Sequence, residues 1–183
     1  MNQIVVLIGP HSSGKTTLGR RLANKLKWKF DDEIGYRQRQ IVLAQDKTQV
    51  ADMEQLDFDQ CVCEEEIQRD LTRNYNAVVE TWHGGNLAYV KERSNSMYTL
   101  LNKRIRKHLN ELDVEILVVP LSIQLSTLTE RHHEKGVDLK FFHRVGTVAV
   151  QECEKLNLRV LPLIQTDDGR SIQQCVSDIL ALI

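Results

Sequence analysis

The chain has 183 residues, 42% of them hydrophobic, with nine glycines and three prolines. This length suits one well-buried core and is too short for two comfortable domains, so we expect a single domain over residues 1 to 183. The 24 lysines and arginines nearly balance the 25 aspartates and glutamates, which gives no electrostatic reason to expect nucleic acid or a membrane as partner. A small-molecule substrate is favoured.

The compartment is indicated by the N-terminus and the cysteines. The chain begins with an apolar strand-like run and no signal-peptide pattern, and no apolar run reaches membrane-spanning length. We therefore expect a cytoplasmic protein. Cys61 and Cys63 lack a metal-ligand spacing and a second pair or histidine nearby, so reduced, partly buried thiols are the better interpretation of the four cysteines.

Apolar runs of strand length alternate with longer segments of helical periodicity along the chain. This alternation predicts a five-stranded parallel sheet with helices on both faces, which is a three-layer α/β/α fold. The second helical segment is expected to divide into two helices near 45–52. We expect strands over 4–8, 28–30, 77–80, 114–119 and 160–164, and helices over 15–27, 34–74, 86–112, 123–135, 139–156 and 171–183.

The most specific motif is GPHSSGKT at 9–16, which follows the first strand and opens the first helix. The N–H groups of such a loop turn inward and form an anion-binding nest at a helix N-terminus. Lys15 is expected to bridge the β- and γ-phosphates of a triphosphate, and the Thr16 hydroxyl to ligate Mg²⁺. A side chain at Gly14 would collide with the phosphates or forbid the backbone angles of the loop. The expected nucleotide contacts are Gly9, Pro10, His11, Ser12, Ser13, Gly14, Lys15, Thr16 and Thr17.

Several classes of triphosphate protein use this motif, and the rest of the chain separates them. A guanine-nucleotide switch needs Asp-x-x-Gly after a later strand and Asn-Lys-x-Asp to read guanine. The letters DEIG at 32–35 lie too close to the first helix, and NKRI at 102–105 lacks the final aspartate. A motor-type ATPase needs subunit-contact modules for which the chain has no room. A small phosphotransferase is therefore favoured.

Two acidic positions are candidates for the chemistry. Glu80 ends the third strand at the carboxyl edge of the sheet, where such sheets bind ligands. If this strand neighbours the first, Glu80 lies opposite Thr16 across the metal, and either holds a Mg²⁺-bound water or accepts the proton of an attacking hydroxyl. Asp31, Asp32 and Glu33 follow the second strand, where a carboxylate serves as general base or, equally, as a helix N-cap. We favour Asp32 if one functions.

These motifs resemble the nucleoside and nucleotide kinase branch of P-loop proteins, closest in layout to thymidylate kinase, with shikimate kinase-like features near the second strand. Where thymidylate kinases have Asp-Arg-Tyr and then Ser-Leu-Ala-Tyr, this chain has ETW at 80–82 and NLAY at 86–89. The segment 114–136 resembles the family's fourth strand and the helix before its basic lid, and 159–183 resembles its last strand and C-terminal helix.

The resemblance implies transfer of the γ-phosphoryl group of ATP, with Mg²⁺, to a small-molecule acceptor such as a nucleoside or nucleotide. It implies that the acceptor binds along 34–74 and that a lid covers the site at 131–144. Arg131, and with less support Arg144, would supply the lid cation, although basic residues at a helix end also complement its dipole. The catalytic residues are then Lys15, Asp32, Glu80 and Arg131, and the metal ligands Thr16 and Glu80.

Other positions keep two interpretations. Thr81 stands where the family has the arginine that grips an acceptor phosphate, which argues against a monophosphate acceptor. Arg93 belongs to an ERS triplet that deoxynucleoside kinases carry earlier in the chain, so it is either an acceptor contact or part of an exposed helix turn. Trp82, before an expected flexible turn at Gly84 and Gly85, either stacks on the acceptor or is a buried wedge.

Three questions remain open in the sequence. Asp167 lies where relatives contact adenine through backbone groups, and Asp-Gly is also an ordinary turn pair. A regulatory P-loop ATPase, suggested by the missing arginine at position 81, and a nucleotide-binding module without turnover are alternatives to a kinase. A homodimer is also open, because the apolar residues of IVLA and CVC could face the sheet or a second subunit.

Overall fold

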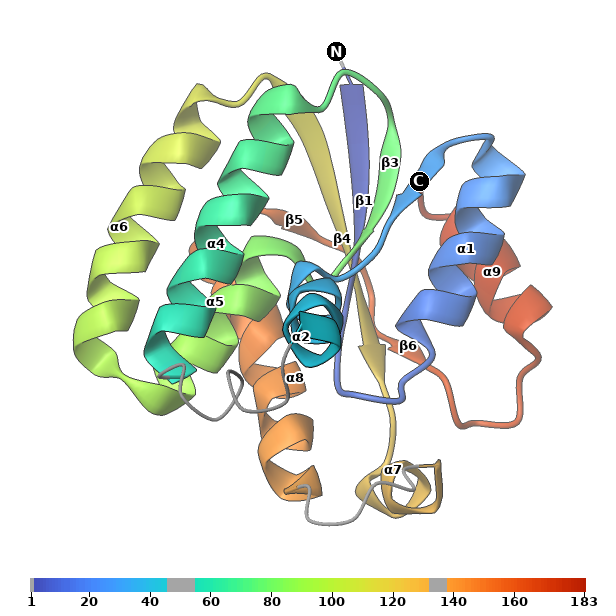
Figure 1. Cartoon of the computed structure of the whole chain (residues 1–183). Coiled ribbons are helices and arrows are strands. Elements are labelled where there is room, and N and C mark those ends of the chain that lie inside the picture. Colours follow the sequence, from blue (N-terminus) through green and yellow to red (C-terminus); the bar gives the residue numbers. More distant parts are fainter. Residues whose placement is uncertain (1, 46–54, 132–137) are drawn as a thin grey trace.

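The computed structural model describes residues 2–45, 55–131 and 138–183, and its centre is a parallel β-sheet (Figure 1). Five strands pair in the order β2-β3-β1-β4-β5, and β6 pairs with the end of β4. The strands are β1 (Asn2–Ile8), β2 (Lys29–Asp31), β3 (Ala77–Glu80), β4 (Val114–Ser122), β5 (Arg159–Val160) and β6 (Ile164–Gln165). The helices are α1 (Lys15–Leu26), α2 (Ile34–Gln45), α4 (Gln55–Thr72), α5 (Trp82–Arg93), α6 (Asn95–Glu111), α7 (Leu125–Arg131), α8 (Leu139–Lys155) and α9 (Ile172–Leu180).

The core lies on both faces of β1, which pairs with β3 on one edge and β4 on the other. Successive side chains of a strand point to opposite faces. Val5 and Leu7 pack with α1 and α9, whereas Ile4, Val6 and Ile8 pack with α5 and α8. Figure 1 shows these helices on the two sides of the sheet, so the three-layer α/β/α prediction is confirmed.

The expected last strand is wrong in its extent. Arg159 and Val160 pair with β4, the Leu161 N–H donates to the Val118 carbonyl at 2.8 Å, and pairing resumes only at Ile164. Pro162 lies between the two strands and has no N–H to donate, so the pairing cannot run through it. The described residues therefore form six strands in place of five.

The single helix expected over 86–112 is also wrong. The segment forms two helices, α5 and α6, and the first begins at Trp82, before the expected start. Ser94 is extended (φ −155°) and its hydroxyl accepts from the Met97 N–H, so it ends α5 and caps α6. Gly84 and Gly85 are not a flexible turn but buried residues in the first turns of α5. Two helices, α2 and α4, lie within 34–74 as expected, and residues 46–54, where the break was expected, lie outside the described residues.

No helix in the described parts of the chain is both long and apolar enough to cross a bilayer.

Candidate functional site

The loop between β1 and α1 is shaped by two glycines for different reasons. At Gly9 a Cβ atom would lie 2.4 Å from the Leu121 carbonyl oxygen of β4, so the loop leaves the sheet where only glycine fits. Gly14 has φ 86°, and a Cβ there would meet no atom within 4 Å, so its backbone angle and not crowding requires glycine. Ser12 (φ 55°) also lies in the left-handed region. The loop therefore combines a close approach to β4 with left-handed backbone positions, as a tight phosphate-binding loop requires.

Lys15 lies inside this loop rather than on its outer surface. It is only 8% exposed, and its ammonium donates to the carbonyls of Gly9 at 3.0 Å and Pro10 at 2.8 Å. Burial lowers the pKa of Lys15, while the charges of Glu33 and Glu80 oppose that shift. The ammonium is therefore held by backbone oxygens and nearby carboxylates at the mouth of the loop.

Thr16 and Glu80 lie together, as the position of β3 beside β1 predicts. Leu7 is in register with Glu80, and the Thr16 hydroxyl lies 2.9 Å from each Glu80 carboxylate oxygen. Glu80 is 7% exposed, and burial raises its pKa while Lys15 opposes the shift. These oxygens, at the mouth of a phosphate loop, form the hard donor set that suits Mg²⁺, which takes few protein ligands and completes its shell with phosphate and water oxygens.

Among the acidic residues after β2, the structure brings Glu33 rather than Asp32 to this centre. The Glu33 carboxylate accepts from the Thr81 hydroxyl at 3.2 Å, and its charge acts on Lys15 and Glu80. The Asp32 side chain is exposed, and its backbone carbonyl accepts from Arg69. Asp31 binds Arg73 and Tyr75 away from the loop. Because α2 begins at Ile34, neither Asp31 nor Asp32 is at its N-cap position.

The junction from β3 to α5 is strained. Thr81 has φ 71° and ψ −62°, and Trp82 has φ 50°. Such angles cost about 1–3 kcal/mol each for residues with a Cβ, and a β-branched threonine is among the least suited. The junction directly follows Glu80, so the strained residues adjoin a carboxylate at the centre of the site.

Helix α8 packs against the phosphate loop at His11 and Pro10. The Phe142 ring meets the His11 ring edge-on with centroids 4.4 Å apart, and a Cβ on Gly146 would lie 2.3 Å from the Pro10 nitrogen. Arg131, at the end of α7, donates to the Ser12 carbonyl at 3.4 Å. Arg131 therefore lies at the phosphate loop.

The other basic residues expected in the lid are placed differently. Arg144 points away from the loop and pairs with Glu92 at 2.5 Å. His143 contacts the Ile123 carbonyl at 3.0 Å. Residues 132–137 of the predicted lid, which include His132, His133 and Lys135, lie outside the described residues.

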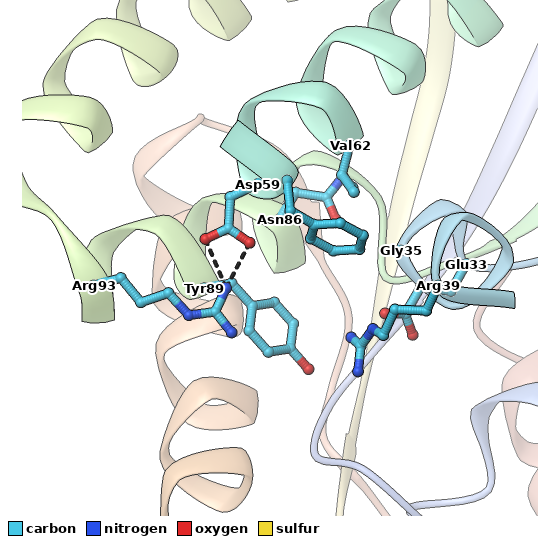
Figure 2. Close-up of a pocket in the computed structure, with 9 residues that line it drawn as sticks. Glu33, Gly35, Arg39, Asp59, Val62, Asn86, Tyr89 and Arg93 are labelled. Atoms are coloured by element: carbon cyan, nitrogen blue, oxygen red, sulfur yellow. Dashed lines mark hydrogen bonds and ion pairs between the residues drawn. The ribbon is translucent and has the colours of Figure 1, made fainter. Parts of the chain in front are cut away.

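A pocket opens beside this centre, between α2, α4 and α5, and encloses about 310 Å³ with its open mouth included (Figure 2). It shares Glu33 with the phosphate site. Figure 2 shows Arg93 between Asp59 and the Tyr89 ring, with Glu33 and Arg39 across the opening. Its lining consists of Glu33, Gly35, Arg39, Phe58, Asp59, Val62, Asn86, Tyr89 and Arg93.

Arg93 is a pocket residue and not part of an exposed helix turn. One of its terminal nitrogens lies 2.5 and 2.6 Å from the two Asp59 oxygens, and its guanidinium carbon lies 5.2 Å from the centre of the Tyr89 ring. Among the described residues, the buried Nδ2 of Asn86 and Nε of Arg39 have no hydrogen-bond partner. The pocket therefore offers two donors and an aromatic surface to a ligand.

Five lining residues fall in the segment 34–74, where the family resemblance places the acceptor, and Arg93 was a candidate acceptor contact. Asn86 and Tyr89 were not predicted as pocket residues, although the sequence carries a signal for them. Asn86, Tyr89 and Arg93 are spaced by three and four residues, which places them on one helix face. The contribution of α4 through Phe58 and Asp59 had no such signal, because only the packing of α4 against α5 brings them there.

Two further candidates serve the structure. Trp82 is a buried wedge, 0% exposed, whose indole N–H donates to Asp70 at 3.1 Å. Asp167 accepts from the Gln124 backbone N–H at 2.8 Å just before α7. The four cysteines are free, and three of them are buried.

Comparisons with known proteins agree with this geometry. A family model described as an AAA domain matches residues 4–81, the part from β1 to the residue after Glu80. No curated protein sequence matches significantly. Among solved structures, NadR protein in complex with NR matches with TM-score 0.68 and 18% identity over 99% of this chain and 51% of the other. The chain thus spans about half the length of NadR.

Two smaller proteins match over nearly their whole length. Thymidylate kinase from Ehrlichia chaffeensis has TM-score 0.64 and 14% identity, with 98% of this chain and 97% of the other covered. Deoxyadenosine kinase from M. mycoides, solved with dCMP and dCDP, has TM-score 0.61 and 10% identity with the same coverage. The chain therefore has the P-loop kinase fold of these proteins, and its resemblance to P-loop nucleoside and nucleotide kinases is confirmed at the level of the fold.

Proposed function

We propose that the protein is a small-molecule kinase that transfers the γ-phosphoryl group of ATP to a hydroxyl of an uncharged, ring-bearing acceptor, with a nucleoside as the best fit. The observation that carries the proposal is the position of Glu33. This carboxylate lines the pocket, accepts from the hydroxyl of Thr81, the residue after Glu80, at 3.2 Å, and lies near enough to Lys15 and Glu80 for its charge to act on both. An acceptor in the pocket would therefore present a hydroxyl beside the phosphate site.

The loop residues would hold and polarise the triphosphate. The loop N–H groups and the Lys15 ammonium would contact the β- and γ-phosphates, and Arg131, already at the Ser12 carbonyl, would reach the transferred group. Thr16 and Glu80 would hold Mg²⁺, which supplies charge neutralisation at the phosphate oxygens. Most of the catalysis in this reaction class comes from alignment and from such charge stabilisation.

Glu33 is the best-placed general base. The acceptor oxygen forms a bond to the γ-phosphorus while the bond from that phosphorus to the β,γ-bridging oxygen breaks, and the hydroxyl proton passes to the carboxylate. We assign this step to Glu33 in place of Asp32, because Glu33 lines the pocket whereas the Asp32 side chain is exposed.

The charges in the pocket favour an uncharged acceptor. Arg93 is paired with Asp59, and Arg39 is matched in charge by Glu33 in the same lining, so the lining carries no net charge. Thr81 replaces the arginine that would grip a phosphate at the end of β3. The Phe58 and Tyr89 rings offer stacking surface, and the Asn86 amide offers a donor to a base carbonyl or ring nitrogen. Together these features favour a nucleoside over a nucleoside monophosphate.

The test is ADP release by the purified protein with ATP and Mg²⁺, alone and with separate pools of nucleosides, nucleoside monophosphates and hydroxy acids. Release that depends on the nucleoside pool, with a new phosphate monoester visible by ³¹P NMR, is expected. Release that ignores every pool would indicate a regulatory ATPase, and nucleotide binding without release a non-turnover module. Lys15→Met is the blank.

A matched pair of variants on α4 tests the pocket. Asp59→Asn removes the partner of Arg93 and should raise the use of monophosphates relative to nucleosides. The control is Glu64→Gln. Glu64 lies on α4 like Asp59, but it pairs with Arg104 of α6 and is not part of the pocket lining. This variant should leave the ratio of monophosphate use to nucleoside use unchanged. An equal change in both variants would refute the pocket assignment.

A further inference from the structure

A buried polar cluster lies behind the strained junction and takes no part in the proposed chemistry. Its centre is Asp70 of α4, whose side chain is fully buried. One carboxylate oxygen accepts from Arg73 and, at 3.1 Å, from the Trp82 indole N–H. The other lies 2.8 Å from Nε2 of His83 and 3.1 Å from Nε2 of His108. Three helices, α4, α5 and α6, therefore meet at this carboxylate.

The cluster is a charged acceptor surrounded by donors. Burial alone would raise the pKa of Asp70, but hydrogen bonds from His108 and His83 and the charge of Arg73 hold it well below its usual range. Burial lowers the pKa of His83, while the hydrogen bond to Asp70 opposes that shift. A carboxylate can only accept, so the Nε2 atoms of His83 and His108 face it as donors. Each carboxylate oxygen thus has two donors.

Two of these donors belong to the residues that follow Thr81. The Thr81 N–H donates to the Leu7 carbonyl at 3.0 Å, and its carbonyl accepts from the Gly85 N–H at 3.2 Å. The Trp82 ring is buried among β1, β3 and α8, and its only polar atom binds Asp70. Strained backbone persists only where several contacts of the surrounding structure fix it. The hydrogen bond from the Trp82 indole to Asp70 is one such contact, on the side of α5.

We propose that Asp70 is a positioning residue: by binding Trp82 and His83 it fixes the Thr81–Trp82 turn and thereby aims the Glu80 carboxylate at Thr16. Asp70 touches no substrate and acts only through the turn. For turnover the inference rests on the proposed kinase function. Its effect on Glu80 is independent of that function and can be read from Mg²⁺-dependent nucleotide binding.

The same three side chains could be taken for a metal site, since one ligand atom each from Asp70, His83 and His108 lie within 4.8 Å of one another. Two observations count against it. Both Asp70 oxygens already have two donors, and the buried Arg73 guanidinium in contact with Asp70 would repel a divalent cation. Metal content therefore belongs in the test.

The test is the variant Asp70→Asn. Its amide replaces one carboxylate oxygen by an NH₂ group, which cannot accept the two hydrogen bonds that this oxygen accepts in the wild type. Nucleotide affinity is measured by calorimetry with AMP-PNP, with and without Mg²⁺. The Mg²⁺-dependent gain in affinity should fall about tenfold, the lower range for losing a partner that orients a metal ligand, while Mg²⁺-free affinity stays constant. In a Trp28→Phe background the emission of Trp82 should shift. With an active acceptor, kcat should fall and the acceptor KM should not.

The matched control is Glu152→Gln. Glu152 is another fully buried carboxylate, which accepts from Lys91 at 2.9 Å, Tyr98 at 2.5 Å and Lys155 at 2.8 Å, away from the turn. It should lose stability without losing Mg²⁺ dependence. Should Asp70→Asn fail to fold, two variants replace it: Trp82→Phe, which removes the indole donor together with part of the buried ring, and His108→Gln.

Three results would overturn the proposal. Unchanged Mg²⁺ dependence in Asp70→Asn, or in both replacement variants, would leave Asp70 a merely structural residue. An equal loss in Glu152→Gln would show a general effect of a damaged core. One equivalent of transition metal in the purified protein, lost in Asp70→Asn, would make the cluster a metal site. Absence of phosphoryl transfer with intact Mg²⁺-dependent binding would refute only the proposed function.

Discussion

The hydroxyl of Thr16 and the carboxylate of Glu80 lie 2.9 Å apart although 64 residues separate them in the chain. They meet because β3 pairs with β1 in the register that sets Glu80 beside Leu7, and because α1 begins just after the loop that continues β1. The pair is the central feature of the site.

Glu80→Gln should reduce turnover about 1000-fold and the Mg²⁺-dependent part of nucleotide affinity about 100-fold. The amide keeps the size of the side chain but removes the charge that, under the proposed function, would hold and orient Mg²⁺. Steady-state kinetics and calorimetry with AMP-PNP measure the two quantities. Normal turnover in this variant would show that the metal assignment is wrong.

Lys15→Met should abolish phosphoryl transfer and leave the fold intact. The side chain donates only to loop carbonyls, at 3.0 and 2.8 Å, and is not part of the hydrophobic core. Far-UV circular dichroism should match that of the wild type while ADP release falls to background. Residual acceptor-dependent transfer would exclude Lys15 as the phosphate cation.

Gly146→Ala should damage the phosphate loop from behind. The added methyl would lie 2.3 Å from the Pro10 nitrogen, and overpacking of this kind costs about 1–3 kcal/mol. Urea unfolding should show the loss of stability, and nucleotide affinity should fall with it. Thr147→Ala, one residue along on the exposed face of α8, is the control and should change neither quantity.

One thiol of four should react in the folded protein. Cys61 is exposed, whereas Cys63, Cys153 and Cys175 are buried, and burial together with nearby acidic residues raises the pKa of Cys153 to about 12. Titration with an aromatic disulfide reagent should release one equivalent in buffer and four in denaturant. Cys61→Ser should remove the fast equivalent, and a fast reaction that survives this change would contradict the packing of α4, α8 or α9.

Glu66→Gln should change how stability depends on pH. Glu66 is fully buried, and burial raises its pKa from 4.5 to about 7 although Arg69 opposes the shift. The folded state then binds more protons than the unfolded state between these pH values, so the carboxylate makes the wild type lose stability as pH rises through that window. The free energy of unfolding of the variant, relative to that of the wild type, should rise by about 3 kcal/mol between pH 4 and pH 8, as measured by denaturant titrations. A constant difference would show that Glu66 ionises normally.

The central part of the fold could be predicted because its signals are local. A buried strand followed by GPHSSGKT, and a second buried strand ending in Glu80, predict where phosphate and metal residues lie without knowledge of the remaining chain. Alternation of strands and helices predicts the layers, because a parallel sheet needs covering on both faces.

The errors arose where tertiary contacts decide. Gly84 and Gly85 look like a turn, but they lie in helix α5. Glycine is needed there because of crowding: a Cβ would lie 2.2 Å from the Cys153 sulfur at Gly84 and 2.4 Å from the Thr81 side chain at Gly85. Asp32 and Glu33 are adjacent carboxylates that the sequence alone does not separate; only the folded structure shows Glu33 in the pocket lining and the Asp32 side chain exposed. Ser94 carried a readable capping signal that the long helical periodicity obscured.

The phosphate loop continues β1, the strand that is paired on both edges and packed on both faces. Amides in such a strand exchange with solvent only when the whole domain opens. A ligand that binds only the folded domain makes that opening rarer, in proportion to its occupancy. Nucleotide in the loop should therefore slow hydrogen exchange throughout β1 and β4, so that occupancy of the loop is recorded by amides that never touch the ligand.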